Sequence, residues 1–74
     1  MILKGINKKA MYDDEEGKSF IIIDNVRRID VFDGETKNLE YLKNNSDETK
    51  YISLEEYDEF YAMDDKGQTI EKIR

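Results

Sequence analysis

The chain has no cysteine, histidine, proline or tryptophan among its 74 residues. Without cysteine there is no disulfide and no thiolate metal site, and without histidine the commonest zinc ligand and the commonest general base are missing. A chain of this length makes one domain, residues 1–74, that buries only about 60% of its unfolded surface. Its stability must therefore come from the packing of aliphatic and aromatic side chains, helped by self-association.

Sequence signatures of catalysis are also missing. There is no G-x-S-x-G sequence, no Walker-type phosphate loop and no G-x-G-x-x-G sequence. Ser19, Ser46 and Ser53 are better explained as strand, turn and cap residues, although a serine or threonine nucleophile with a lysine base stays formally open. Eighteen acids offer many carboxylate pairs, but no spacing singles one out for glycosidase chemistry. We expect a protein that is not an enzyme and holds no cofactor.

The apolar runs are much shorter than the ~20 residues that a membrane helix needs, and residues 1–4 lack the apolar core of a signal peptide. We therefore expect a cytoplasmic protein. The abundance of lysine, asparagine, isoleucine and acids is typical of a low-GC bacterium or its phage. Hydrophobic residues make up 38% and charged residues 41%, so disorder is the alternative for the whole chain. The apolar runs 20–23 and 29–32 favour a folded core.

Two segments, 11–20 and 62–70, share one local plan: apolar residues, an aspartate pair, a glycine, then apolar residues again. Aspartate favours the start of a type I turn and glycine supplies the positive φ that closes it, so both segments predict β-hairpins with positive φ at Gly17 and Gly67. The ligand spacing of an EF-hand calcium loop is absent. A carboxylate metal site at Asp13–Glu16 or Asp64–Asp65 is an alternative to solvated turn carboxylates, and we expect no metal.

The remaining pattern predicts a mainly β fold: a small barrel or sandwich of 6–7 short antiparallel strands built from hairpins. Residues 20–23, apolar on both faces, predict a central strand, and Gly5 predicts a bend or bulge in the first strand. The S-x-x-E spacing of Ser53 and Glu56 is that of a capping box, so we expect at most one short helical turn near 54–58. The predicted strands lie near residues 2–12, 18–24, 29–32, 39–42, 51–54, 60–63 and 70–73.

The net charge of −6 comes from one aromatic-rich stretch, residues 51–65, which holds six acids and no base. The other residues carry twelve acids and twelve bases. A concentrated negative patch with aromatic rings inside it is suited to docking on a basic surface. The candidate partner-binding residues are Glu55, Glu56, Tyr57, Asp58, Glu59, Tyr61, Asp64 and Asp65.

The simplest alternative for this stretch is a solvated acidic face over core aromatics, which serves only solubility. Arg27 and Arg28 with nearby tyrosines are the alternative ligand-binding residues, because arginine binds phosphate in a bidentate manner and tyrosine stacks on bases. Direct binding to nucleic acid or to an anionic membrane is disfavoured by the acidic charge, and neighbouring strand residues such as these two arginines face opposite sides.

In length, composition, acidity and hairpin-rich pattern the chain resembles small phage-encoded proteins that inhibit bacterial defence systems or host enzymes. Its segment 62–73 is similar to terminal hairpins in many small uncharacterised Firmicute and phage proteins. The resemblance implies one of two functions. The first is an inhibitor that blocks a bacterial defence or host protein by occupying its nucleic-acid groove, as inhibitors of CRISPR nucleases and of uracil-DNA glycosylase do. The second is an oligomeric sponge that sequesters a nucleotide immune signal. A structural module without a ligand is the third hypothesis.

A further expectation concerns assembly. A 74-residue chain with no disulfide or metal lies near the lower limit of stability, and exposed strand edges carrying Tyr41, Tyr51 or Tyr61 offer pairing between copies. We expect a homo-oligomer, most simply a dimer.

Overall fold

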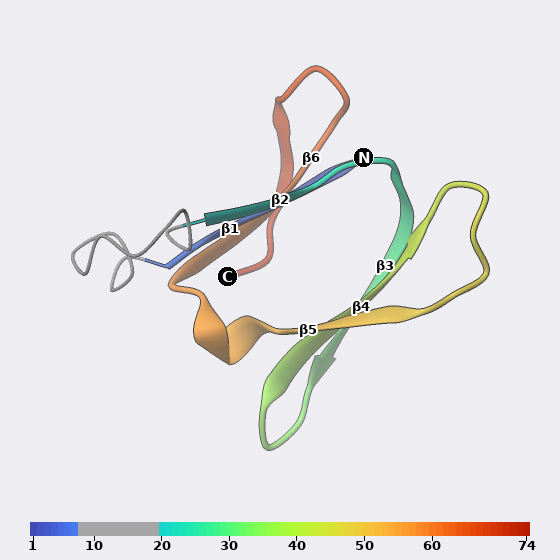
Figure 1. The fold of residues 1–74 in the computed structure, drawn as a ribbon. Coiled ribbons are helices and arrows are strands. Elements are labelled where there is room, and N and C mark those ends of the chain that lie inside the picture. The colour runs from blue at the N-terminus through green and yellow to red at the C-terminus, as the bar shows by residue number, and fades with distance from the viewer. Residues whose placement is uncertain (8–19) are drawn as a thin grey trace.

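In the computed structural model, which describes residues 1–7 and 20–74, two antiparallel sheets face each other (Figure 1). The first sheet has the strand order β2-β1-β6-β7 and the second β3-β4-β5. The elements are β1 (Ile2–Ile6), β2 (Phe20–Ile23), β3 (Val26–Asp33), β4 (Lys37–Lys43), β5 (Lys50–Ser53), the 3-10 turn η1 (Leu54–Glu56), β6 (Glu59–Met63) and β7 (Thr69–Lys72). The predicted mainly β fold with a single short helical turn is confirmed, and of the two predicted architectures the arrangement is sandwich-like, because the sheets do not close into a barrel.

One bend carries the chain from the first sheet into the second. β2 ends at Ile23, Asn25 takes a left-handed conformation with φ of 57°, and β3 begins at Val26. Asparagine tolerates this conformation better than most residues. Asn44 fixes the bend: its backbone N–H donates to the Asn25 carbonyl at 2.8 Å and its side-chain amide to the Asn25 side-chain oxygen at 2.7 Å. Such a bend lets one continuous segment contribute to both layers of the sandwich.

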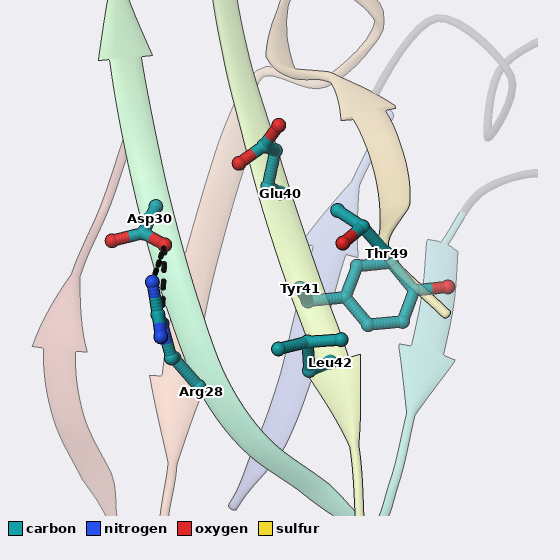
Figure 2. A pocket seen from close by; sticks show the side chains of 6 residues that line it. All are labelled: Arg28, Asp30, Glu40, Tyr41, Leu42 and Thr49. Atoms are coloured by element: carbon teal, nitrogen blue, oxygen red, sulfur yellow. Dashed lines mark hydrogen bonds and ion pairs between the residues drawn. The ribbon is translucent and has the colours of Figure 1, made fainter. Parts of the chain in front are cut away.

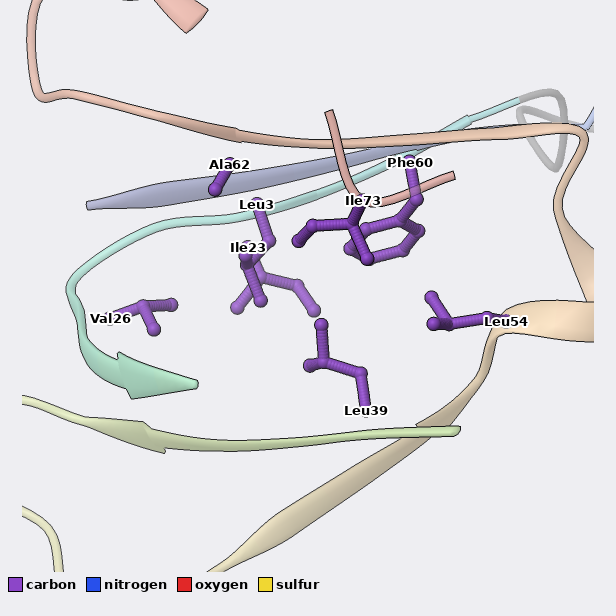
Figure 3. Close-up of a cluster of buried hydrophobic side chains, with 8 residues drawn as sticks. All are labelled: Leu3, Ile23, Val26, Leu39, Leu54, Phe60, Ala62 and Ile73. Atoms are coloured by element: carbon purple, nitrogen blue, oxygen red, sulfur yellow. The ribbon is translucent and has the colours of Figure 1, made fainter. Parts of the chain in front are cut away.

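The core lies between the sheets (Figure 3). Strand alternation places Leu3 of β1 and Phe60 of β6 on the inner face of the first sheet, opposite Leu39 of the second, and all three are fully buried. The 3-10 turn adds Leu54, whose side chain closes one end of the layer. The buried hydrophobic residues are Leu3, Ile23, Val26, Leu39, Leu54, Phe60, Ala62 and Ile73.

Three strand-level predictions are wrong. Tyr41 and Tyr61 do not lie on strand edges, because β4 and β6 are interior strands, whereas Tyr51 does lie on the edge strand β5. The Phe20–Ile23 segment is not a central strand covered on both faces: β2 is an edge of the first sheet, and Phe20 and Ile22 are 50% and 57% exposed. Gly5 does not bend β1 either, because the register continues without a shift from Leu3 through Ile6. Gly5 instead admits two aromatic rings, since a Cβ there would lie 2.8 Å from the ring of Phe60 and 2.9 Å from that of Tyr57.

Some of the turn predictions are confirmed and others are not. Gly67 has a φ of +84°, which confirms the hairpin between β6 and β7, whereas Gly17 lies outside the described residues. Asp33-Gly34 ends β3, as the sequence indicates. The capping box is not formed: Ser53 precedes η1 but makes no side-chain capping bond, and the turn spans three residues instead of five.

Candidate functional site

The 3-10 turn and the first residues after it form a fixed corner between β5 and β6 (Figure 1). Leu54 anchors the corner in the core, and the Tyr57 N–H donates to the Leu54 carbonyl at 3.1 Å. The Asp58 N–H donates to the carbonyl of Ile6 at 2.8 Å, which ties the corner to the first sheet. The backbone that carries Glu55, Glu56 and Asp58 is therefore held at both ends.

The side chain of Tyr57 packs between this corner and the first sheet. Its ring packs edge-on against Phe60, with 5.5 Å between the centroids and 72° between the planes. Burial raises the pKa of the Tyr57 phenol, and the nearby charge of Glu56 raises it further. Tyr57 thus belongs mostly to the packing above Gly5, and its contribution to a docking surface is smaller than the sequence suggests.

The acidic side chains of the corner are exposed, but a cation from elsewhere in the chain approaches one of them. Glu55 accepts a hydrogen bond from the backbone N–H of Lys37 at 3.2 Å and pairs with the guanidinium of Arg74 at 3.4 Å. The Lys37 ammonium is used elsewhere, since it donates to the Ile73 carbonyl at 3.4 Å. The stretch has no base of its own in sequence, yet the fold brings the guanidinium of Arg74 beside Glu55. Glu56 and Asp58 are exposed on the same corner.

Glu59 and Tyr61 lie on a different surface. Both point outward from β6, on the face of the first sheet away from the core, because the alternate residues Phe60 and Ala62 are buried. The Tyr61 hydroxyl donates to Glu59 Oε1 at 2.7 Å. This hydrogen bond, together with partial burial and the charge of Glu59, raises the pKa of the Tyr61 phenol. Glu59 therefore lies next to the acidic corner, and Tyr61 lies further along the outer face of the first sheet.

Asp64 and Asp65 lie at the far end of β6, about 16 Å along the strand from Glu59. Asp64 Oδ1 accepts from the backbone N–H groups of Lys66 and Gln68, each at 2.9 Å, which is a turn-forming role. Asp65 pairs with the amino group of Met1 at 3.3 Å. The eight predicted partner-binding residues therefore form two acidic groups separated by a strand, and not one continuous patch.

The two arginines of the alternative ligand site diverge. Arg27 donates to the backbone carbonyls of Lys43 and Ser46 at 3.2 and 2.7 Å and pairs with Asp47 at 3.3 Å, so it fixes the loop between β4 and β5. Arg28 points to the other side of β3 and donates to Asp30 Oδ2 through Nε and Nη2, at 3.3 and 3.2 Å.

Arg28 does line a cavity of about 260 Å³ on the outer face of the second sheet (Figure 2). Asp30 and Glu40 stand directly opposite each other across the β3–β4 ladder, so the lining carries two carboxylates and one guanidinium. The sequence analysis missed this cavity. Its signal is the spacing of two between Arg28 and Asp30, which places both on one face of a strand. The lining residues are Arg28, Asp30, Glu40, Tyr41, Leu42 and Thr49.

Within the part of the chain that the structure describes, no three aspartate or glutamate side chains gather as a metal site. Nor does any helix in that part have the length and apolarity needed to cross a membrane. Comparison with protein-family models, with curated proteins and with solved structures finds no match for this chain.

Proposed function

We propose that the chain is a non-enzymatic binding domain that docks on a basic surface of a partner protein. The docking surface is the acidic corner, defined as Glu55, Glu56, Tyr57 and Asp58, with Glu59 at its rim. The observation that supports this proposal most strongly is the presentation of exposed carboxylates on a backbone that Leu54 and the Asp58–Ile6 hydrogen bond hold in place. A partner that binds a fixed corner does not have to order it, which lowers the entropic cost of association.

The contacts of Glu55 indicate how such a partner engages the corner. Arg74 reaches Glu55 with a single guanidinium nitrogen at 3.4 Å, a long and half-exposed contact that contributes little to stability. A guanidinium or ammonium group of the partner takes over this position at small cost. Glu56 and Asp58 add negative charge beside it, and the combined field attracts a basic groove at long range.

The resemblance to small phage proteins supplies the setting for this proposal. In that setting the domain acts in the cytoplasm of a bacterial host and inhibits a defence or host protein by occupying its basic groove. Carboxylates arranged near a groove built for phosphates compete with nucleic acid for the same lysines and arginines.

The nucleotide-sponge alternative has weaker support. Arg27 is engaged with the β4–β5 loop, and the cavity beside Arg28 carries more negative than positive charge. Phosphate groups would meet the carboxylates of Asp30 and Glu40 at that cavity.

The test of the acidic corner uses a labelled oligo-arginine peptide as a defined basic probe, with fluorescence anisotropy read at low and at moderate salt. Glu56→Gln with Asp58→Asn removes two charges from the corner. Asp33→Asn with Glu35→Gln removes the same charge from an exposed turn at the end of β3. We expect the corner variant to bind about tenfold more weakly with a flatter salt dependence, and the control to bind almost as wild type.

Both variants should remain folded, because exposed carboxylates change stability by no more than about 0.5 kcal/mol in typical cases. Equal weakening by the two variants would show that total charge is responsible and would contradict a docking corner. The same pair of variants then serves in a capture experiment from bacterial lysate at low and high salt, where only a protein retained by wild type and lost by the corner variant counts as the partner.

A further inference from the structure

The outer face of the first sheet is unusually apolar. β2 alternates normally, with Ile23 buried inside, but its outward residues are Phe20 and Ile22, which are 50% and 57% exposed. An antiparallel sheet that faces water on one side ordinarily carries polar residues there, and an edge strand ordinarily carries charges. Two large hydrophobic side chains on the outside of an edge strand indicate that something covers them.

The strand register extends this face across three strands. Ile6 of β1 stands beside Phe20, and Ile2 stands beside Met63 of β6. All of these residues point away from the core, because their sequence neighbours Leu3, Gly5 and Ala62 are the buried ones. The apolar and aromatic residues of this outer face are Ile2, Ile6, Phe20, Ile22, Tyr61 and Met63.

Charges of both signs lie within the face. Lys4 stands between Ile22 and Tyr61 in the register, with its ammonium 5.8 Å from the ring centroid of Phe20. Lys72 stands on the other side of Tyr61, and Glu59 lies one row further along β6. A two-fold interface must be complementary to itself, so it needs both signs on one surface. This face meets that condition: lysines in one row and a glutamate in the next.

We propose that two copies of this chain associate through the outer faces of their β2-β1-β6-β7 sheets, with Lys4 and Lys72 of one copy facing Glu59 of the other. The face carries two lysines against one glutamate, so it does not suit the basic partner that the acidic corner is proposed to bind. The two surfaces share only Glu59, which lies at the rim of the corner, and a dimer leaves Glu56 and Asp58 available.

The area of this face determines how tightly we expect two copies to associate. Four strands of four or five residues cover roughly 15 Å in each direction. Specific interfaces usually bury about 800 Å² on each partner, and this face is smaller than that, as in weak and transient complexes. We expect a dissociation constant in the micromolar range, with an apolar centre and a polar rim.

Sedimentation equilibrium between about 5 and about 500 µM tests the proposal. Phe20→Lys and Phe32→Lys form a matched pair, because both phenylalanines are 50% exposed but Phe32 lies on the second sheet. Each variant lowers the net negative charge by one, so general repulsion cannot explain a loss of dimer. We expect Phe20→Lys to weaken association at least tenfold and Phe32→Lys to leave it within about twofold. Ile22→Thr, a milder change that keeps a β-branched residue, should weaken it in the same direction.

A charge reversal tests the orientation. Glu59→Lys and Lys72→Glu should each weaken the dimer, and the double variant should recover part of the loss, provided that circular dichroism shows all three folded. Wild-type protein that is monomeric over the whole range would overturn the proposal and assign the face to a different protein. Equal weakening by Phe20→Lys and Phe32→Lys would also overturn it, and binding of oligo-arginine by the corner is unaffected by either outcome.

Discussion

The two sheets contribute comparable inner faces to one core, but their outer faces differ. The outer face of the first sheet carries Phe20, Ile22 and Tyr61, with the aliphatic residues of β1 between them. The outer face of the second carries the ladder of Asp30 and Glu40, with Arg28 bound to Asp30. In a domain this small the core alone leaves little margin of stability. Phe32 and Tyr51 are exposed on the second sheet as well, at 50% and 70%, so the two outer faces differ in their charged residues more than in their exposed hydrophobic residues.

The largest expected effect on stability comes from comparing one phenylalanine-to-alanine substitution in the core with the same substitution at a half-exposed position. Phe60→Ala empties a fully buried site between the sheets and should cost about 3–5 kcal/mol, enough to unfold much of the population. Phe32→Ala, at a half-exposed position on the second sheet, should cost less than about 1 kcal/mol. Urea denaturation of both variants measures the difference, and similar midpoints would contradict the description of the core.

The next effect concerns the close approach of β1 to the aromatic rings. Gly5→Ala places a Cβ 2.8 Å from Phe60 and should cost about 1–3 kcal/mol through overpacking. Gly34→Ala, in the turn after β3, meets no atom within 4 Å and should change the midpoint little. Thermal denaturation of the two variants under the same conditions gives the comparison. A stable Gly5→Ala protein would mean that the rings of Tyr57 and Phe60 can move aside.

A smaller effect is expected at the hairpin of the first sheet. Gly67 has a φ of +84°, a region in which a β-branched residue is strained, so Gly67→Val should cost on the order of 1 kcal/mol or more. Gly34→Val is the control in the second sheet, since no positive φ is recorded there. Chemical denaturation should place the control near wild type; if Gly67→Val matched it, the turn geometry would be wrong.

The smallest effect is spectroscopic and involves one tyrosine on each sheet. Hydrogen bonds to Glu59 and Glu40 raise the phenol pKa values of Tyr61 and Tyr51, respectively, above the ordinary value of 10.0. In ultraviolet titrations, Glu59→Gln should lower the pKa of Tyr61 and leave Tyr51 unchanged, with the converse for Glu40→Gln. A raised pKa in the folded state means that the unfolded chain loses its proton first, so stability falls as pH rises above about 10. Stability that rose in that range would contradict both hydrogen bonds.

Much of the fold could be predicted because local signals agree with it. Asp33-Gly34 and Asp64 with Gly67 end strands where turn chemistry says they should. The β-branched runs form strands, and the ambiguous segment after Ser53 forms the expected short turn. What could not be predicted is which strands lie at an edge. The Phe20–Ile23 run has the composition of a strand covered on both faces, and the sequence alone does not reveal that β2 lies at the edge of its sheet with Phe20 and Ile22 exposed.

The candidate site was predictable only in part, because charge counted along a sequence differs from charge counted in space. Residues 51–65 contain no base, yet the guanidinium of Arg74, which follows β7, pairs with Glu55. Asp64 and Asp65 are near Glu59 in sequence, but an extended strand separates them. Arg27 and Arg28 do diverge, as expected, but the strand register shifts between Val26 and Arg28, so strict alternation does not hold at this point of β3.

The pairing of β1 with β6 has a consequence for how the protein is made. The second sheet is a meander of neighbouring strands, whereas the centre of the first joins Ile2 to Met63. On the ribosome the residues of β3, β4 and β5 can pair as soon as they emerge, and β1 can pair with β2 early, but β1 must wait for β6 until residues 59–63 are synthesised. Non-local pairing of this kind slows folding, so we expect the pairing of β1 with β6 to be a late step in the folding of each newly synthesised chain.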